Sequence, residues 1–167
     1  MNISLGRTVG ASALALALFA TSAFAADYTV ELSAASDEGV PAEYTMMQWM
    51  EARGEVRAVE DGDKHEITFE ASNLIADGLY TFWWVNPGVV RMDMGPAGGV
   101  PDNEFRADSD GNAEVTFEVS ADNDYQRIVV VYHADDETHG EEPGEMGVVS
   151  FEHLAGAWPG PDGVEEM

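Results

Sequence analysis

Short stretches in which apolar and polar residues alternate recur along the chain, and none after residue 25 keeps the period of an amphipathic helix. In residues 66–70, Ile67 and Phe69 alternate with two glutamates and a threonine, and residues 113–119 are apolar at the odd positions. Such alternation is typical of a β-strand with one face in the core and the other in water. The pattern predicts eight strands, at residues 28–33, 44–51, 55–59, 65–71, 79–86, 113–119, 127–133 and 147–154.

Turn-forming clusters of Asp, Gly, Asn and Ser separate these stretches. Residues 128–132 are apolar throughout, which predicts a central strand covered on both faces. Seven or eight short strands in one unit predict an all-β fold, an antiparallel β-sandwich with an immunoglobulin-like Greek key. We expect this domain to span residues 26–157 and to be followed by a flexible, acidic, Pro- and Gly-rich tail at residues 158–167.

The beginning of the chain has the three parts of a secretory signal peptide. Arg7 precedes an apolar run at residues 11–20, and Ala23 and Ala25 place small residues where a signal peptidase cleaves. The apolar run is too short to span a membrane. We therefore expect residues 1–25 to be removed and the rest to be exported, to the periplasm or the extracellular medium.

Composition narrows the classes of function. The 167 residues contain no cysteine, which excludes disulfides, thiolate metal ligands and a cysteine nucleophile. The formal net charge is −25 at pH 7, so phosphate backbones and anionic membrane surfaces are repelled, and we exclude both as partners. The acidity is consistent either with solubility in a salty environment or with capture of cations.

The first candidate site is the acidic stretch between two histidines, His133 and His139. Imidazole together with carboxylates suits zinc or copper, and carboxylates alone suit calcium. The loop is long enough to bring both rings to one metal ion, although the spacing does not require it. The alternative hypothesis is a solvated acidic turn in which His133 or Thr138 makes local hydrogen bonds.

The second candidate is a set of methionines. Met92 and Met94 lie in a long irregular segment, residues 86–103. Three more methionines, Met46, Met47 and Met50, lie within the predicted strand at residues 44–51. Thioethers with a histidine would form a soft site for Cu(I). The alternative is that these side chains fill irregular gaps in the core.

The aromatic stretch at residues 79–86 is the third candidate. Tyr80, Phe82 and Trp84 share one strand face, which would be a platform for a glycan or a protein if it were exposed. The alternative is an ordinary buried strand. No motif for a catalytic triad, a zinc protease or a phosphate-binding loop is present in the sequence, so we predict no catalytic residue.

Three segments, Gly78–Trp84, Phe105–Gly111 and Tyr132–Gly140 with the following Pro143-Gly144, resemble a pattern of uncharacterised exported bacterial β-sandwich proteins. That resemblance implies no activity, cofactor or catalytic residue.

We expect a non-enzymatic exported binding module whose working surface lies where residues 92–99 and 133–144 converge; its ligand could be a metal ion, a glycan or a protein. The alternatives are a copper or zinc protein or metal-dependent enzyme using His133, His139, Met92 and Met94, and a structural envelope protein pairing through the aromatic face. The oligomeric state has no signature in the sequence.

Overall fold

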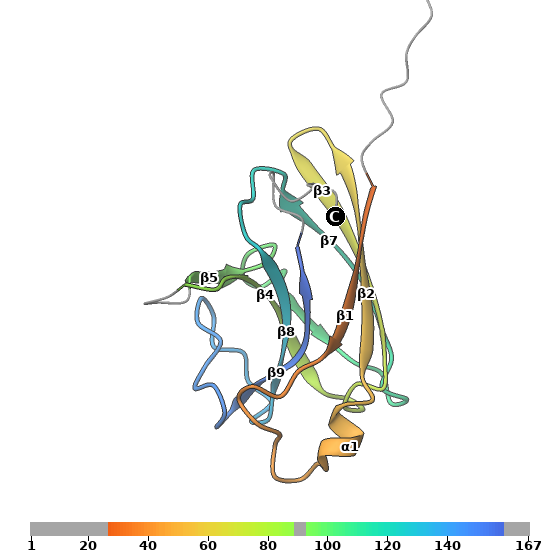
Figure 1. Ribbon diagram of the computed structural model, residues 1–167, viewed down its shortest axis with the longest axis vertical. Helices are drawn as coiled ribbons and strands as arrows, with labels where there is room; N and C mark the ends of the chain where they lie inside the picture. The colour runs from red at the N-terminus through yellow and green to blue at the C-terminus, as the bar shows by residue number, and fades with distance from the viewer. Residues whose placement is uncertain (1–26, 89–92, 159–167) are drawn as a thin grey trace, which may run out of the picture.

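The computed structural model describes residues 27–88 and 93–158, which form nine β-strands and one short helix (Figure 1). The predicted signal peptide, Met92 and residues 159–167 lie outside the described residues. Within the described part, no helix has the length and apolar character needed to cross a membrane. The elements are β1 (Asp27–Ala34), α1 (Met46–Trp49), β2 (Arg53–Asp61), β3 (Lys64–Ser72), β4 (Leu79–Asn86), β5 (Asp93–Pro96), β6 (Glu104–Arg106), β7 (Ala113–Ser120), β8 (Arg127–His133) and β9 (Ser150–Ala157).

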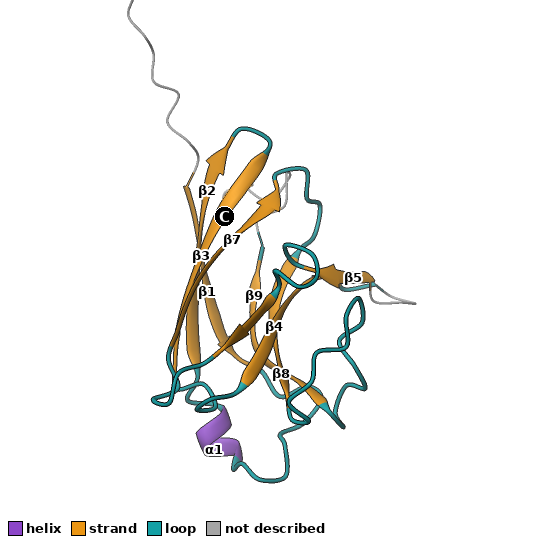
Figure 2. Cartoon of the chain, turned by 180° about the vertical axis from the view of Figure 1, so that it is seen from behind, coloured by secondary structure: helices purple, strands orange, loops and turns teal. Residues whose placement is uncertain are grey.

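The strands form one continuous antiparallel sheet in the order β5-β4-β8-β9-β1-β2-β3-β7, with β6 also pairing β4. The sheet curls into a half-barrel, so that β1, β2, β3 and β7 face β4, β8 and β9 across the core (Figures 1 and 2). Only two residue pairs, Ser33↔Ala155 and Ala34↔Leu154, join the two halves between β1 and β9. The all-β, antiparallel prediction is confirmed. The two-sheet sandwich and the immunoglobulin-like Greek key are not confirmed, because this short junction makes the halves a single sheet.

The core lies inside the curl and is built from alternate residues of each strand. Ile67 and Phe69 of β3 are fully buried, as the alternation predicted. Every residue of β8 after Arg127 is buried, which confirms a central strand covered on both faces. Trp84 is only 6% exposed, so the hypothesis of an exposed aromatic platform for pairing is wrong. Trp158, assigned to the flexible tail in the sequence prediction, instead packs on Trp84 with ring centroids 4.6 Å apart.

The predicted strand at residues 44–51 is wrong, because one helical turn, α1, lies there. The side-chain oxygen of Thr45 accepts the backbone N–H of Gln48, and the Gln48 side chain accepts the backbone N–H of Thr45. This reciprocal capping box satisfies N–H groups that the start of a helix otherwise leaves without partners. Its signature, Thr followed three residues later by Gln, is visible in the sequence, but the aromatic and β-branched residues of the stretch favoured a strand.

A chain of buried hydrogen bonds attaches α1 to the sheet. His153 of β9 is fully buried and lies 3.1 Å from the carbonyl oxygen of Trp49, to which its Nε2–H must donate. Its Nδ1 therefore accepts the hydroxyl proton of Tyr80, at 3.0 Å, and the Tyr80 oxygen accepts the backbone N–H of Ile75. Every group in this chain has its hydrogen-bond partner only while His153 is neutral, because a protonated ring could no longer accept the Tyr80 hydroxyl proton.

This arrangement leads us to expect that stability declines in mild acid. Burial lowers the pKa of His153 from 6.5 to about 4, with the Trp49 carbonyl opposing the shift. The unfolded chain therefore binds a proton first, and the contribution of His153 is complete above pH 6.5 and is lost as the pH falls toward 4. Between pH 7 and pH 5 this loss amounts to about 2 kcal/mol.

Urea unfolding of the wild type and of His153→Phe at both pH values measures the effect. The variant retains an aromatic ring against Trp49 but has no group that titrates. The free-energy difference between the two proteins should shrink by about 2 kcal/mol at pH 5. Parallel pH profiles of the two proteins would contradict the expectation.

Candidate metal centre

The candidate site lies where β8 ends, on the face of β4 and β8 that points away from the core. That face carries a small apolar cluster of Trp83 and Val85 from β4 with Val129 and Val131 from β8. The segment at residues 134–149 connects β8 to β9 and folds back over this cluster, because Met146 packs against it. The connection thus shields the outer face of the central strands and carries the acidic residues between the two histidines.

Contacts with β6 hold the outer side of this connection. The guanidinium of Arg106 donates to the carboxylate of Asp136 at 2.7 Å, and the Thr138 hydroxyl donates to Glu104 at 3.4 Å. Asp136 itself has a φ of 60°, a left-handed conformation that Asp tolerates better than most residues. The ion pair is exposed and contributes less than about 1 kcal/mol to stability.

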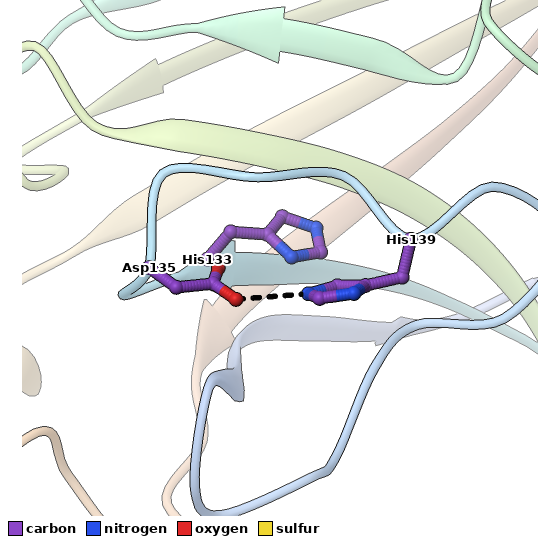
Figure 3. A group of neighbouring side chains, drawn as sticks. All are labelled: His133, Asp135 and His139. Atoms are coloured by element: carbon purple, nitrogen blue, oxygen red, sulfur yellow. Dashed lines mark ion pairs between the residues drawn. The ribbon is translucent and has the colours of Figure 1, made fainter.

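Three potential metal ligands meet at the start of the connection (Figure 3). The ring centroids of His133 and His139 are 5.8 Å apart, and His139 Nε2 lies 3.1 Å from a carboxylate oxygen of Asp135. One potential ligand atom from each residue lies within 4.8 Å of the others. Within residues 27–88 and 93–158, no other group of three or more histidine and acidic side chains brings its ligand atoms this close together. His133 is 2% exposed at the base of the group, whereas the other two side chains reach solvent.

A directed chain of hydrogen bonds passes through His133. The Trp83 indole N–H donates to Thr81 Oγ1, which lies 2.7 Å from His133 Nε2. On the other side of the ring, Ser150 Oγ lies 3.2 Å from His133 Nδ1 and donates its proton to the Pro143 carbonyl oxygen. Because the Ser150 hydroxyl has only one proton, it must accept from Nδ1–H. Nε2 of the neutral ring then accepts the Thr81 hydroxyl proton, and every member of the chain is satisfied.

The electrostatics keep His133 neutral. Burial, together with a smaller contribution from the nearby His139 ring, lowers the pKa of His133 from 6.5 to about 4, and the Asp135 carboxylate opposes this shift. A neutral imidazole is the form that coordinates a metal ion. At physiological pH the site therefore combines a neutral buried ring with a carboxylate and a second imidazole near the surface.

Two imidazoles and one carboxylate form a donor set suited to zinc or copper and lack the soft thiolates of closed structural sites. His133 would coordinate through Nδ1, the nitrogen that faces His139 in Figure 3. Its proton would then reside on Nε2 and be donated to Thr81 Oγ1, since that oxygen is within 2.7 Å. Such a bond from the second ring nitrogen to an acceptor is the usual way in which proteins orient a ligating histidine.

Met94, one of the two methionines predicted as ligands, is not brought to this site. Met94, in β5, pairs with Val85, whereas His133 pairs with Leu79 at the other end of β4. Six strand positions separate the two, roughly 20 Å along the sheet. Met94 packs on the apolar outer cluster instead. The predicted convergence of residues 92–99 with residues 133–144 is therefore not observed at the histidines, where β6 provides the neighbouring residues.

Four residues that contribute to the site were not among the predicted metal ligands. Asp135 was one of many acids in the loop, and its position four residues before His139 is the only local signal. Thr81 and Ser150 become partners of His133 through the pairing of β8 with β4 and β9, which no local pattern indicates. Gly144 has a φ of 88°, and its backbone lies directly against the His139 ring.

No family model matches the chain, and no curated protein is significantly similar to it.

Proposed function

We propose that this protein is a metal-binding module that holds one divalent transition-metal ion, zinc or copper, on His133, Asp135 and His139. The observation that carries the proposal is the convergence of three ligand atoms of suitable chemistry within 4.8 Å of one another. Asp135 and His139 form an ion pair when the imidazole is protonated, and a metal ion would replace that proton between the same two atoms.

The supporting residues favour ligation over a purely structural loop. His139 is packed by the Gly144 backbone, and Thr81 is placed to accept from the second nitrogen of His133. The protein would therefore meet the ion with two of three ligands already oriented, which lowers the entropic cost of binding. Three protein ligands leave room for solvent or for a further ligand on the ion.

The acidity of the chain supports capture of a cation. The net charge of −25 attracts divalent ions to the surface and raises their local concentration near the loop. We also propose that the protein acts outside the cytoplasm, on the basis of the signal-peptide pattern in residues 1–25.

Isothermal titration of the purified protein with Zn²⁺ tests the proposal. We expect one saturable site per chain, and Asp135→Asn should weaken it by about 100-fold or more, since even the loss of an outer hydrogen-bond partner costs 10- to 100-fold. Asparagine keeps the oxygen that accepts the Glu137 backbone N–H, so the loop turn is preserved. The substitution therefore removes the negative charge of the ligand and leaves the turn intact.

Glu137→Gln is the matched control, because it removes one negative charge from an exposed neighbour in the same loop. It should change the affinity by less than about threefold, as expected for a screened surface charge. Equal losses in the two variants, or binding that has no defined stoichiometry, would show that the loop only attracts counterions.

A further inference from the structure

The exposed methionines of α1 are the most unusual feature of the surface outside the candidate metal centre. Among the described residues, five large hydrophobic side chains are exposed, and three of them are Met46, Met47 and Met50, at 54%, 76% and 39%. Clustered methionines of this kind occur both in apolar contact surfaces and in soft metal sites. Here the exposed side chains of one helical turn carry thioether sulfur.

The turn that carries them is firmly held. Thr45 and Gln48 form the capping box, and Trp49 points inward, where its indole N–H donates to the Ala35 carbonyl at 2.6 Å. The Trp49 ring stacks on His153 with centroids 3.7 Å apart. Thr45, Gln48 and Trp49 thus fix the conformation of the turn. The three methionines are the side chains left facing outward.

Their spacing suits convergence on one ion. Met46 and Met50 are four residues apart, Met47 and Met50 are three apart, and Met50 retains helical backbone angles as the C-cap. Residues three and four apart on a helix have Cβ atoms about 5–6 Å from each other. The methionine side chain has three rotatable bonds, so three sulfur atoms can reach a common point above the turn.

We propose that Met46, Met47 and Met50 form a second metal site, selective for a soft monovalent ion, Cu(I). Thioethers favour soft Cu(I) over zinc or other divalent ions. Exposed acids flank the turn, Glu43 before it and Glu51 after it, and they favour a cation at this end of the molecule. Arg53 also lies nearby, but its guanidinium is directed to the carbonyl oxygens of Met50 and Ala52. This inference is independent of the divalent site, because the two share no ligand.

Titration with Ag(I), a redox-stable probe for Cu(I), tests the second site. The methyl resonances of methionine in ¹H–¹³C spectra of the protein should report binding. We expect those of Met46, Met47 and Met50 to shift together and saturate at one equivalent, while those of Met94 and Met146 stay in place. Shifts confined to histidine resonances or to the other methionines would overturn the assignment.

Leucine substitution separates metal binding from an apolar contact. The variant Met46→Leu/Met50→Leu keeps the apolar surface and removes two sulfur atoms, so its Ag(I) affinity should fall at least tenfold. Met94→Leu/Met146→Leu is the matched control and should bind Ag(I) as the wild type does. Equal affinity of the wild type and the first variant would show that this surface is not a thioether site. His139→Ala should leave Ag(I) binding at α1 unchanged, so failure of either site is distinguishable from failure of the other.

Discussion

Replacing Gly144 by alanine is expected to lower the Zn²⁺ affinity by about 10- to 100-fold, the range observed when a group that orients a metal ligand is lost. A Cβ atom on Gly144 would lie 2.6 Å from His139 Cδ2 and 2.9 Å from both His139 Nε2 and Ser150 Oγ. Real Cβ atoms do not make contacts this short, so the His139 ring has to move out of the group. The ring carries the nitrogen that pairs with Asp135, and the ligand set is therefore broken.

The matched control is Gly140→Ala in the same loop. Gly140 also has a positive φ, 70°, but a Cβ atom there would meet nothing within 4 Å. Both variants therefore carry similar backbone strain, and only Gly144→Ala displaces His139. Calorimetric Zn²⁺ titrations should show a near-normal site in Gly140→Ala. Equal losses in both variants would assign the effect to loop strain and contradict a role for His139 in binding.

The Trp49→Ala variant is expected to lose about 3–5 kcal/mol of unfolding free energy, the range found for truncation of a buried aromatic side chain. Trp49 is fully buried, and its ring stacks on His153 and makes edge contacts with Tyr132 and Phe151. Its loss also leaves the Ala35 carbonyl without the indole donor. The single turn of α1 is too short to be stable by itself and depends on this anchor.

Chemical denaturation measures the loss, with Met47→Ala as the control on the same turn. Met47 is exposed, and its truncation should change the unfolding free energy by less than about 0.5 kcal/mol. If Trp49→Ala does not fold, Trp49→Phe retains the ring and removes the indole N–H, with an expected loss of about 1–3 kcal/mol. Similar small effects of Trp49→Ala and Met47→Ala would contradict the anchoring role.

Local patterns were sufficient to predict the central strands. The bounds of β4 and β8 match the predicted stretches at residues 79–86 and 127–133. These strands are apolar at consecutive positions, so both of their faces need burial, and this pattern can be recognised from the local sequence alone. The turn at α1 was missed because the aromatic and β-branched residues Tyr44, Thr45 and Trp49 favoured a strand, although the cap formed by Thr45 and Gln48 was present in the sequence.

The arrangement of the strands depends on contacts that no local pattern encodes. The single sheet results from the two-residue junction between β1 and β9, and the pairing of β8 with β9 contains a register shift between Val130 and Val131. The segment before β6 contains β5 and was predicted as an irregular loop, because its Gly and Pro residues conceal a four-residue strand. Such pairings are determined by tertiary packing.

The same distinction applies to the candidate site. His133 and His139 could be identified from the sequence because they are chemically distinctive and close along the chain. Asp135 could not be singled out among many acids, and Met94 was included although its pairing with Val85 places it far from the histidines. Sequence reasoning thus identified suitable ligand chemistry, and only the strand register showed which candidates meet.

The position of the proton on the His133 ring distinguishes a metal ligand from a purely structural histidine. In long-range ¹H–¹⁵N spectra of the metal-free protein at pH 7, the hydrogen-bond chain requires the proton on Nδ1, next to Ser150. We predict that one equivalent of Zn²⁺ converts the ring to the form protonated on Nε2, next to Thr81, with a simultaneous shift of His139 and no change at His153. An Nδ1-protonated His133 that persists at saturating Zn²⁺ would contradict the proposed centre and leave His133 as a structural residue.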